Sequence, residues 1–275
     1  MRESGSQTAL MVAAFRGRAS AIQPPLCTDP WAQALAGPDG ERLADLYGQL
    51  NPHATLWMGV RTRFLDDLVC ATESKQVVTL GAGLDTRAAR LARAGLRFFE
   101  VDHPHTQAIK KARLAELPGY PVDAATYASC DFETQAPLEQ LAAHGFDPSQ
   151  SALVIWEGVV PYLTEPAIRA TLSGLAHGLH PDSLIVFDTI SKKVAQNQSR
   201  RAADQELSKL VGEVGEPFRF GLDDPTPLCA DCGLMHVRSV SFDQATLSIT
   251  GTYERQRAFR FQSFVLASRG RSFQV

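Results

Sequence analysis

The feature that most constrains the fold is an apolar strand that ends in a glycine turn and continues as a helix. Residues 77–80 are a short apolar run, and Gly81 and Gly83 follow it directly before a helical pattern. Glycine lets the backbone turn tightly and approach a ligand, which a Cβ would prevent. The next helix points its N-terminal amides toward that ligand. This segment predicts a strand of an open α/β sheet with a nucleotide-like ligand at its end.

A second predicted strand favours an adenosine-containing ligand. It disfavours the alternative that Gly81 and Gly83 only allow a tight turn. Residues 96–101 read as a strand, and Asp102 follows at about the spacing expected of a carboxylate that binds ribose hydroxyls. Residues 84–87 lack the third glycine of a dinucleotide fold, and no P-loop occurs. The acidic Asp85 at the helix entrance suits the cationic, phosphate-free S-adenosylmethionine (SAM) better than a pyrophosphate. SAM is therefore the expected cofactor, with S-adenosylhomocysteine as its product.

Apolar periodicity extends this alternation along the chain. Residues 8–75 follow helical spacing, and extended runs at 234–242 and 257–267 predict two late strands that close the sheet as a hairpin. Within the second run, residues 263–267 read as a central, doubly buried strand. The fold class is therefore α/β: a Rossmann-like, seven-stranded, mostly parallel sheet with helices on both faces. The other predicted strands are 76–81, 96–101, 124–129, 152–156 and 183–188, and the predicted helices are 85–94, 104–117, 136–144 and 165–179.

The organisation along the chain indicates one domain over residues 1–275. Residues 191–216 are its most polar part and lie beyond the end of a predicted core strand, where loops surround the ligand crevice of open sheets. A mobile lid is one reading of this segment, and a solvated surface helix is the alternative. The predicted parts are a helical preface at 1–60, the cofactor-binding core at 61–190, the lid insertion at 191–225 and the C-terminal strands at 226–275.

Composition and charge narrow the class of protein. A hydrophobic content of 44% suffices for a full core, while the net charge of −3 gives no electrostatic footprint for nucleic acid. Neither a signal peptide nor an apolar run of membrane-spanning length occurs, so we expect neither membrane nor nucleic-acid partners. An odd number of cysteines does not form a disulfide framework, which favours the cytoplasm. Cys229 and Cys232 lack two further ligands, so no metal site is predicted.

Five ordered motifs resemble the leucine carboxyl methyltransferase family. They are residues 61–66, 80–87, 100–104, 130–132 and 157–163. The resemblance spans most of the chain and implies a class I SAM-dependent O-methyltransferase. That family includes eukaryotic enzymes that esterify a protein C-terminal leucine and bacterial relatives that methylate polyketides and other small molecules. The short helical preface and single modest insertion of this chain resemble the bacterial small-molecule members.

The same resemblance implies a set of cofactor-binding residues at the strand ends. Arg61 would hold the SAM carboxylate through its bidentate fork, and Asp102 would accept hydrogen bonds from the ribose hydroxyls. Asp131 would take the adenine amino group, Phe132 would offer an amide and a ring beside the base, and Glu157 would balance the ammonium group. Helix capping, turns and ordinary ion pairs are the structural alternatives for these carboxylates. The full set is Arg61, Gly81, Ala82, Gly83, Asp102, Asp131, Phe132 and Glu157.

The preferred acceptor is a carboxylate of a small molecule such as a polyketide-like acid. Methyl transfer from a sulfonium is an in-line displacement that depends mainly on positioning, and a carboxylate needs no general base. Cationic or phenolic donors would orient it, and the candidates are Tyr162, Arg16 and Arg18, with Arg61 possible as a shared group. A peptide C-terminal carboxylate is an alternative acceptor.

Other acceptors and other classes remain open. A phenol or hydroxyl acceptor would need a proton acceptor, for which His53, His103 and His105 are the nearest histidines. A SAM-binding module without catalysis would show the same cofactor residues. A nicotinamide-dependent oxidoreductase is disfavoured by the missing glycine and by the absence of a Tyr-x-x-x-Lys arrangement. The sequence does not predict an oligomeric state.

Overall fold

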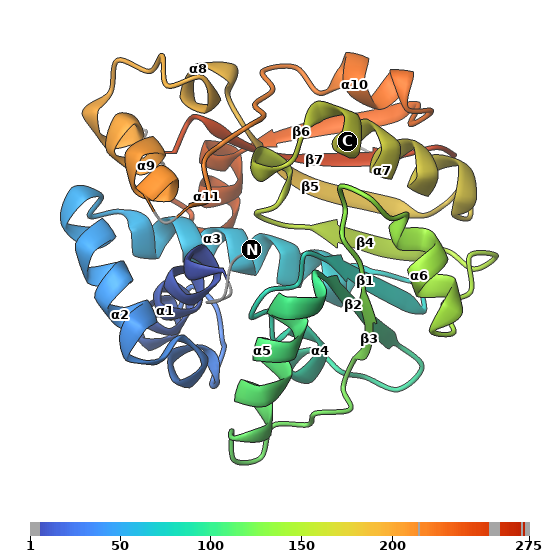
Figure 1. The fold of residues 1–275 in the computed structure, drawn as a ribbon, viewed down its shortest axis with the longest axis horizontal. Helices are drawn as coiled ribbons and strands as arrows, with labels where there is room; N and C mark the ends of the chain where they lie inside the picture. The colour runs from blue at the N-terminus through green and yellow to red at the C-terminus, as the bar shows by residue number, and fades with distance from the viewer. Residues whose placement is uncertain (1–5, 214, 253–258, 271, 273–275) are drawn as a thin grey trace.

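The strands form one seven-stranded sheet in the order β3-β2-β1-β4-β5-β7-β6. The computed structural model describes residues 6–213, 215–252, 259–270 and 272, and Figure 1 shows the sheet in the body of the molecule with helices around it. β1 to β5 are parallel, whereas β7 runs antiparallel to both β5 and β6. The strands are β1 (Gln76–Leu80), β2 (Arg97–Asp102), β3 (Thr126–Ser129), β4 (Ala152–Trp156), β5 (Leu184–Ile190), β6 (His236–Ser241) and β7 (Gln262–Ser268).

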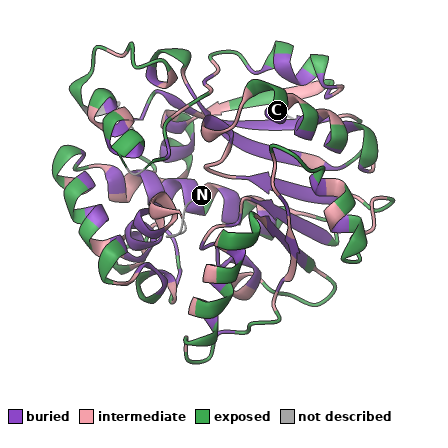
Figure 2. Cartoon of the chain, in the orientation of Figure 1, coloured by how far each residue is buried: buried purple, intermediate pink, exposed green. Residues whose placement is uncertain are grey.

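Two apolar cores cover the two faces of this sheet, which confirms the predicted fold class. Successive strand residues point to opposite faces, so Val77 joins one core and Val78 the other. The first core packs against α1, α2, α3 and α11, and the second against α6, α7 and α10. Figure 2 shows the central strands buried along their length, as expected of a parallel sheet between helical layers. The helices are α1 (Gln7–Ala21), α2 (Ala32–Leu50), α3 (Ala54–Ala71), α4 (Arg87–Arg90), α5 (Pro104–Ala115), α6 (Pro137–Ala143), α7 (Glu165–Gly178), α8 (Lys192–Ala195), α9 (Ala202–Glu213), α10 (Thr226–Asp231), α11 (Phe242–Thr250) and the 3₁₀ helix η1 (Val160–Tyr162).

The predicted helical segment before β1 consists of α1, α2 and α3. The Ser6 side chain caps α1 by accepting a hydrogen bond from the Ala9 amide at 3.1 Å. α2 is kinked where Gly37, with φ +61°, precedes Pro38, because a proline ring cannot follow a regular helical turn. These helices place the first turns of α1 beside the carboxyl ends of the central strands (Figure 1).

Three local predictions differ from the structure. The helix expected over 85–94 is only α4, because the Asp85 carboxylate accepts the Arg87 amide at 2.6 Å and holds the entrance in a turn. The strand expected over 124–129 begins later, at Thr126. The two late strands do pair antiparallel, but α11 lies between them in sequence, so their connection is no tight hairpin. Residues 257 and 258 of the predicted last strand lie outside the described residues.

None of the helices in the described ranges is both long and apolar enough to cross a membrane.

Candidate functional site

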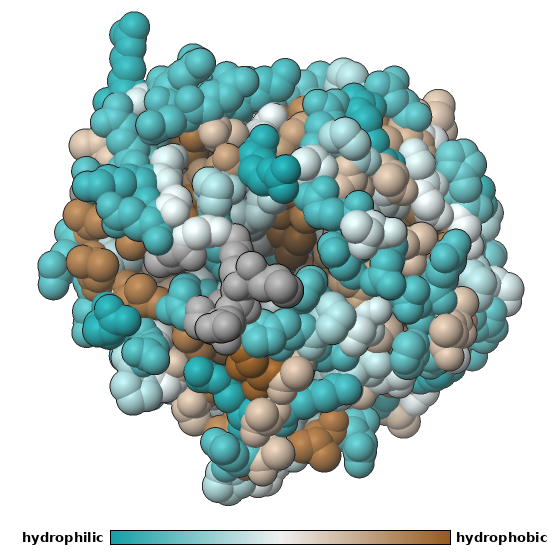
Figure 3. Space-filling model, in the orientation of Figure 1, coloured by the Kyte–Doolittle hydropathy of each residue, from teal (hydrophilic) through white to brown (hydrophobic). Residues whose placement is uncertain are grey.

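A cavity of about 340 Å³ opens where the strand order reverses between β1 and β4. Such a switch point leaves a crevice at the carboxyl ends of the strands, because the connections after the two strands lead to opposite faces. Figure 3 shows a hollow with an apolar floor on this side of the molecule, framed by polar side chains. The wall combines the turns after β1, β2, β3 and β4 with parts of α1, η1 and α9.

The glycine turn after β1 has the close geometry that its sequence predicts. Gly81 and Gly83 have φ of +66° and +46°, a region that favours glycine. A Cβ on Gly81 would overlap the side chain of Val159, so no other residue fits there without a shift. The Gly83 amide donates to Asp102 Oδ2 at 2.5 Å, and the His103 amide donates to Asp102 Oδ1 at 2.6 Å. The turn is therefore fixed directly to the end of β2.

Asp102 lines the cavity, where its carboxylate can accept hydrogen bonds from hydroxyl groups. Burial raises the pKa of its carboxyl group, and hydrogen bonds from the Gly83 and His103 amides oppose that shift. Each carboxylate oxygen can accept more than one hydrogen bond, so the amides leave acceptor capacity toward the cavity. The side chain also precedes Pro104 at the start of α5, but its hydrogen bond to the turn after β1 goes beyond helix capping.

An arginine and two carboxylates meet at the ends of β4 and β5. Arg61, from the buried face of α3, donates from Nε to Glu157 Oε1 at 2.7 Å, and its Nη1 lies 3.8 Å from Asp188 Oδ2. Asp188 is 2% exposed and accepts the Gly158 amide and Gln262 Nε2, each at 2.6 Å. Burial raises the pKa of Asp188, whereas for Glu157 neighbouring arginines outweigh burial and lower its pKa.

Arg87 extends this cluster into a buried network of ion pairs. Its guanidinium contacts Glu157 Oε2 at 2.7 Å and Asp66 Oδ1 at 2.8 Å, and it also pairs with Asp85. Burial alone would raise the pKa of Asp85, but the adjacent Arg87 and other cations lower it well below its usual range. Arg90 continues the network, with Nη1 at 2.5 Å from Asp66 Oδ2. The carboxyl ends of β4 and β5 are thus backed by a fixed set of alternating charges.

Asp131 and Phe132 follow β3 and also line the cavity. Asp131 accepts the Glu133 amide at 3.0 Å, so its side chain orders the turn. The Phe132 ring lies 6.1 Å from the Trp156 ring, which holds it beside the end of β4. The structure therefore brings all eight predicted cofactor residues into the wall of one cavity: Arg61, Gly81, Ala82, Gly83, Asp102, Asp131, Phe132 and Glu157.

Tyr162 also lines the cavity, in η1 directly after β4. Its ring packs at 5.4 Å from the Phe218 ring. Burial and the nearby Glu216 carboxylate raise the pKa of its phenol, so the hydroxyl keeps its proton at neutral pH. Within the described part of the chain, this hydroxyl makes no hydrogen bond to protein, which leaves it able to donate to a ligand.

The two arginines predicted to orient an acceptor are each paired with an acidic side chain. Arg16 lines the cavity, but its Nε lies 2.6 Å from Asp29 Oδ2 and its Nη2 donates to the Leu84 carbonyl at 2.6 Å. Arg18 does not line the cavity, and its guanidinium pairs with Glu41 at 2.7 Å. Positions two apart on a helix point in different directions, so α1 turns Arg16 toward the cavity and Arg18 away from it, and the structure gives no support to Arg18 as a group that orients the acceptor.

One histidine and one cysteine, His103 and Cys130, line this cavity. His103 lines it, whereas His53 and His105 do not. Across the described ranges, no group of three or more His, Cys, Asp or Glu side chains is arranged to hold a metal ion, and Cys229 and Cys232 are buried free thiols.

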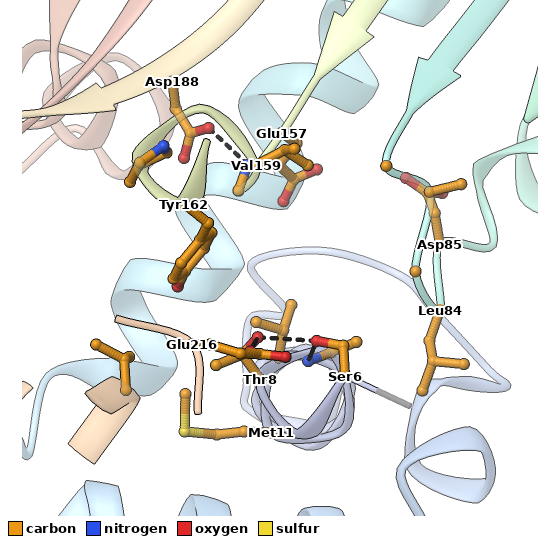
Figure 4. A pocket seen from close by; sticks show the side chains of 18 of the residues that line it. Ser6, Thr8, Met11, Leu84, Asp85, Glu157, Val159, Tyr162, Asp188 and Glu216 are labelled. Atoms are coloured by element: carbon orange, nitrogen blue, oxygen red, sulfur yellow. Dashed lines mark hydrogen bonds between the residues drawn. The ribbon is translucent and has the colours of Figure 1, made fainter. Parts of the chain in front are cut away.

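Two of the cavity's acidic residues, Asp188 and Glu216, have no place among the residues predicted from the sequence. Asp188 ends the predicted strand 183–188, so its place at the carboxyl end of a parallel strand is a signal that could have identified it. Glu216 follows α9, is 5% exposed, and accepts a hydrogen bond from Thr8 in the first turn of α1 (Figure 4). No sequence pattern marks Glu216, because its position depends on packing between segments far apart in the chain.

Two sequence comparisons show the family of the chain. The sequence profile described as leucine carboxyl methyltransferase matches residues 9–176. A protein of Mycobacterium sp. (strain JLS), named for S-adenosyl-L-methionine-dependent methyl transfer, is 32% identical over 232 residues, covering 76% of this chain and 78% of the relative.

Solved structures share the fold at low sequence identity. A DUF574 family protein from Streptomyces avermitilis superposes with a TM-score of 0.66 at 15% identity, covering 97% of this chain and 98% of the other. A protein from Thermobifida fusca described as a methyltransferase gives a TM-score of 0.63 at 16% identity, covering 96% and 94%. The matching profile and the mycobacterial relative identify the chain as a member of the leucine carboxyl methyltransferase family, a methyltransferase whose cofactor is SAM.

Proposed function

We propose that the chain transfers the methyl group of SAM to an oxygen atom of a small molecule. We also propose that this oxygen belongs to a phenol or another hydroxyl group. The observation that supports this choice is the charge of the cavity wall. Acidic side chains outnumber the arginines, and Arg16 and Arg61 each sit in an ion pair. The acidic residues that line the wall are Asp85, Asp102, Asp131, Glu157, Asp188 and Glu216.

A carboxylate acceptor fits this wall less well. Moving an anion from water into a confined site is unfavourable unless a cation compensates its charge. Of the cations predicted for that role, Arg16 is bound to Asp29 and Arg18 lies outside the cavity. A neutral hydroxyl group needs no cation. The small-molecule and peptide carboxylates considered from the sequence stay predictions, and the assay below tests them too.

The residues at the strand ends fit SAM. We propose that Arg61 and Glu157 face its amino-acid group, that Asp102 accepts its ribose hydroxyls, and that Asp131 and Phe132 border its adenine. The positive φ of Gly81 and the absence of a Cβ leave room for close approach to the backbone. When bound, SAM supplies a methyl group on a positively charged sulfur, and the acidic wall complements that charge.

The insertion after β5 supports a role as a lid. Leu207 and Val211 of α9 are buried and line the cavity, so one face of this helix covers the site instead of facing solvent. Exclusion of water favours transfer to the acceptor over side reactions. We propose that residues 191–225 close over the acceptor and help to select it.

The test is an acceptor panel of matched pairs. The purified chain is incubated with SAM and either 2-naphthol or 2-naphthoic acid, and either 4-methylphenol or 4-methylbenzoic acid, with S-adenosylhomocysteine and methylated product measured. We expect methyl ethers from the phenols. Methyl esters alone would refute the hydroxyl assignment and restore the carboxylate. SAM binding by calorimetry without methylation of any member would instead favour a binding module without catalysis.

A further inference from the structure

One part of the cavity is built from segments that the cofactor residues do not use. We call it the acceptor chamber, and it comprises Thr8, Met11, Tyr162, Leu207, Glu216 and Phe218. These residues come from α1, η1, α9 and the chain after α9, so none of them belongs to the strand ends that line the rest of the wall. Apart from Thr8, Tyr162 and Glu216, the chamber is apolar, which suits an aromatic or aliphatic acceptor.

The carboxylate of Glu216 is held in this chamber from both sides. Its backbone amide donates to the Val211 carbonyl at 2.7 Å, which fixes the residue at the end of α9. Its side chain accepts a hydrogen bond from Thr8, which in turn lies 3.0 Å from Ser6 Oγ (Figure 4). With 5% of its surface exposed, Glu216 presents a buried carboxylate at a defined place in the cavity wall.

Tyr162 faces the same part of the chamber. In Figure 4 its hydroxyl points toward the side of the cavity that holds Thr8 and Glu216. The Arg219 amide donates to the Pro161 carbonyl at 2.7 Å, so the chain after Glu216 is fastened to η1 and keeps Phe218 against the Tyr162 ring. The chamber thus offers a hydrogen-bond donor and a carboxylate acceptor, the pair that a hydroxyl group can satisfy.

We propose that Glu216 accepts the proton of the acceptor hydroxyl during methyl transfer, while Tyr162 donates a hydrogen bond to the same oxygen. This assignment rests on the proposed function. The oxygen lone pair forms the new bond to the methyl carbon, the carbon–sulfur bond breaks with its electron pair going to sulfur, and the O–H proton passes to a carboxylate oxygen of Glu216. Charge is conserved, because the sulfonium and the carboxylate are both neutralised.

The test uses two phenols of different acidity. 4-Methylphenol is neutral at pH 8.5 and must lose its proton to react, whereas 4-nitrophenol is already ionised at that pH. Glu216→Gln keeps the shape of the side chain and an oxygen for Thr8, but it removes the basic group. We expect kcat for 4-methylphenol to fall about 100-fold or more, and kcat for 4-nitrophenol to change far less. The SAM affinity measured by calorimetry should stay within about twofold.

A matched control distinguishes proton acceptance by Glu216 from a purely structural role of its hydrogen bond to Thr8. Thr8→Val removes the hydrogen bond to Glu216 but keeps the carboxylate, so the ratio of the two kcat values should stay near that of the wild type. Equal losses for both phenols in Glu216→Gln, or the same ratio change in Thr8→Val, would show that Glu216 only fastens α1 and would overturn the assignment. If the wild type binds SAM but methylates neither phenol, the proposed hydroxyl acceptor fails, and the role of Glu216 fails with it.

Discussion

Replacing Arg87 with leucine should destabilise the whole protein, because it leaves several buried carboxylates without their partner. Arg87 is 3% exposed, and the side chains of Asp66, Asp85 and Glu157 that it contacts are 9%, 9% and 12% exposed. Breaking a buried ion pair by removing one partner costs about 3–5 kcal/mol, since an uncompensated charge stays in the interior. The loss should therefore appear in the free energy of unfolding and not only in cofactor binding.

The size of the effect can be converted to a melting temperature. An unfolding entropy of about 2.1 cal/mol/K per residue, applied to the 275 residues, gives about 0.58 kcal/mol/K for the chain. A loss of about 3–5 kcal/mol then corresponds to a decrease in Tm of roughly 5–9 °C. Differential scanning calorimetry at pH 7.5 and constant scan rate measures this directly.

Arg63→Leu is the matched control, because the same change is made at an exposed pair. The Arg63 and Asp67 side chains are 49% and 52% exposed, and their contact is an i,i+4 pair on α3. Such a pair contributes about 0.3–0.5 kcal/mol, so Tm should change by less than about 1 °C. If Arg87→Leu shifts Tm by no more than this control, the buried network does not stabilise the fold as argued.

Three further outcomes follow from the site and the buried charges. Gly81→Ala should abolish SAM binding measured by calorimetry, because an added Cβ overlaps a neighbouring side chain. The control Gly95→Ala should only lower Tm, because Gly95 has φ +80° but no atom within 4 Å of the added Cβ. Equal SAM affinity in the two variants would refute the need for a close backbone approach at Gly81. Asp102→Asn should weaken SAM binding by about 1–3 kcal/mol, roughly 5- to 150-fold, and an unchanged Kd would remove Asp102 from the ribose site. Burial raises the pKa of Glu100 from 4.5 to about 7 despite its contact with Lys110. Between these two pH values the folded state keeps a proton on Glu100 that the unfolded state has lost, so the stability contributed by this group falls as pH rises from 4.5 to 7. Urea unfolding at pH 5 and pH 7.5 should show a smaller pH difference in Glu100→Gln/Lys110→Met than in the wild type; an identical difference would contradict the shift.

Local rules explain what the sequence could predict. The spacing after the glycine turn predicts Asp102, and the family resemblance adds Glu157; both then meet at one edge of the sheet because parallel strands end there together. The glycine turn was selected because two glycines end an apolar run. These signals lie within a few residues of the groups that they identify, so they could be read without knowing how distant segments pack.

The remaining part of the site depends on distant partners. Arg16 and Arg18 looked available on the sequence, but Asp29 and Glu41 reach them through the packing of α1 against its neighbours. Glu216 acquires its place through Thr8, which is far away in the chain, and through the turn at the end of α9. Neither the loss of two candidate cations nor the gain of a carboxylate leaves a pattern in the local sequence.

The position of β7 has a consequence for synthesis on the ribosome. β7 follows every other strand in the sequence, yet it lies between β5 and β6 and pairs with both. Its first residue, Gln262, also holds the Asp188 carboxylate in the cavity wall. Until this strand emerges, the nascent chain exposes the edge of β5, leaves β6 without a partner and lacks a complete wall around the ligand. We therefore expect the complete cavity wall to form only after β7 has paired with β5.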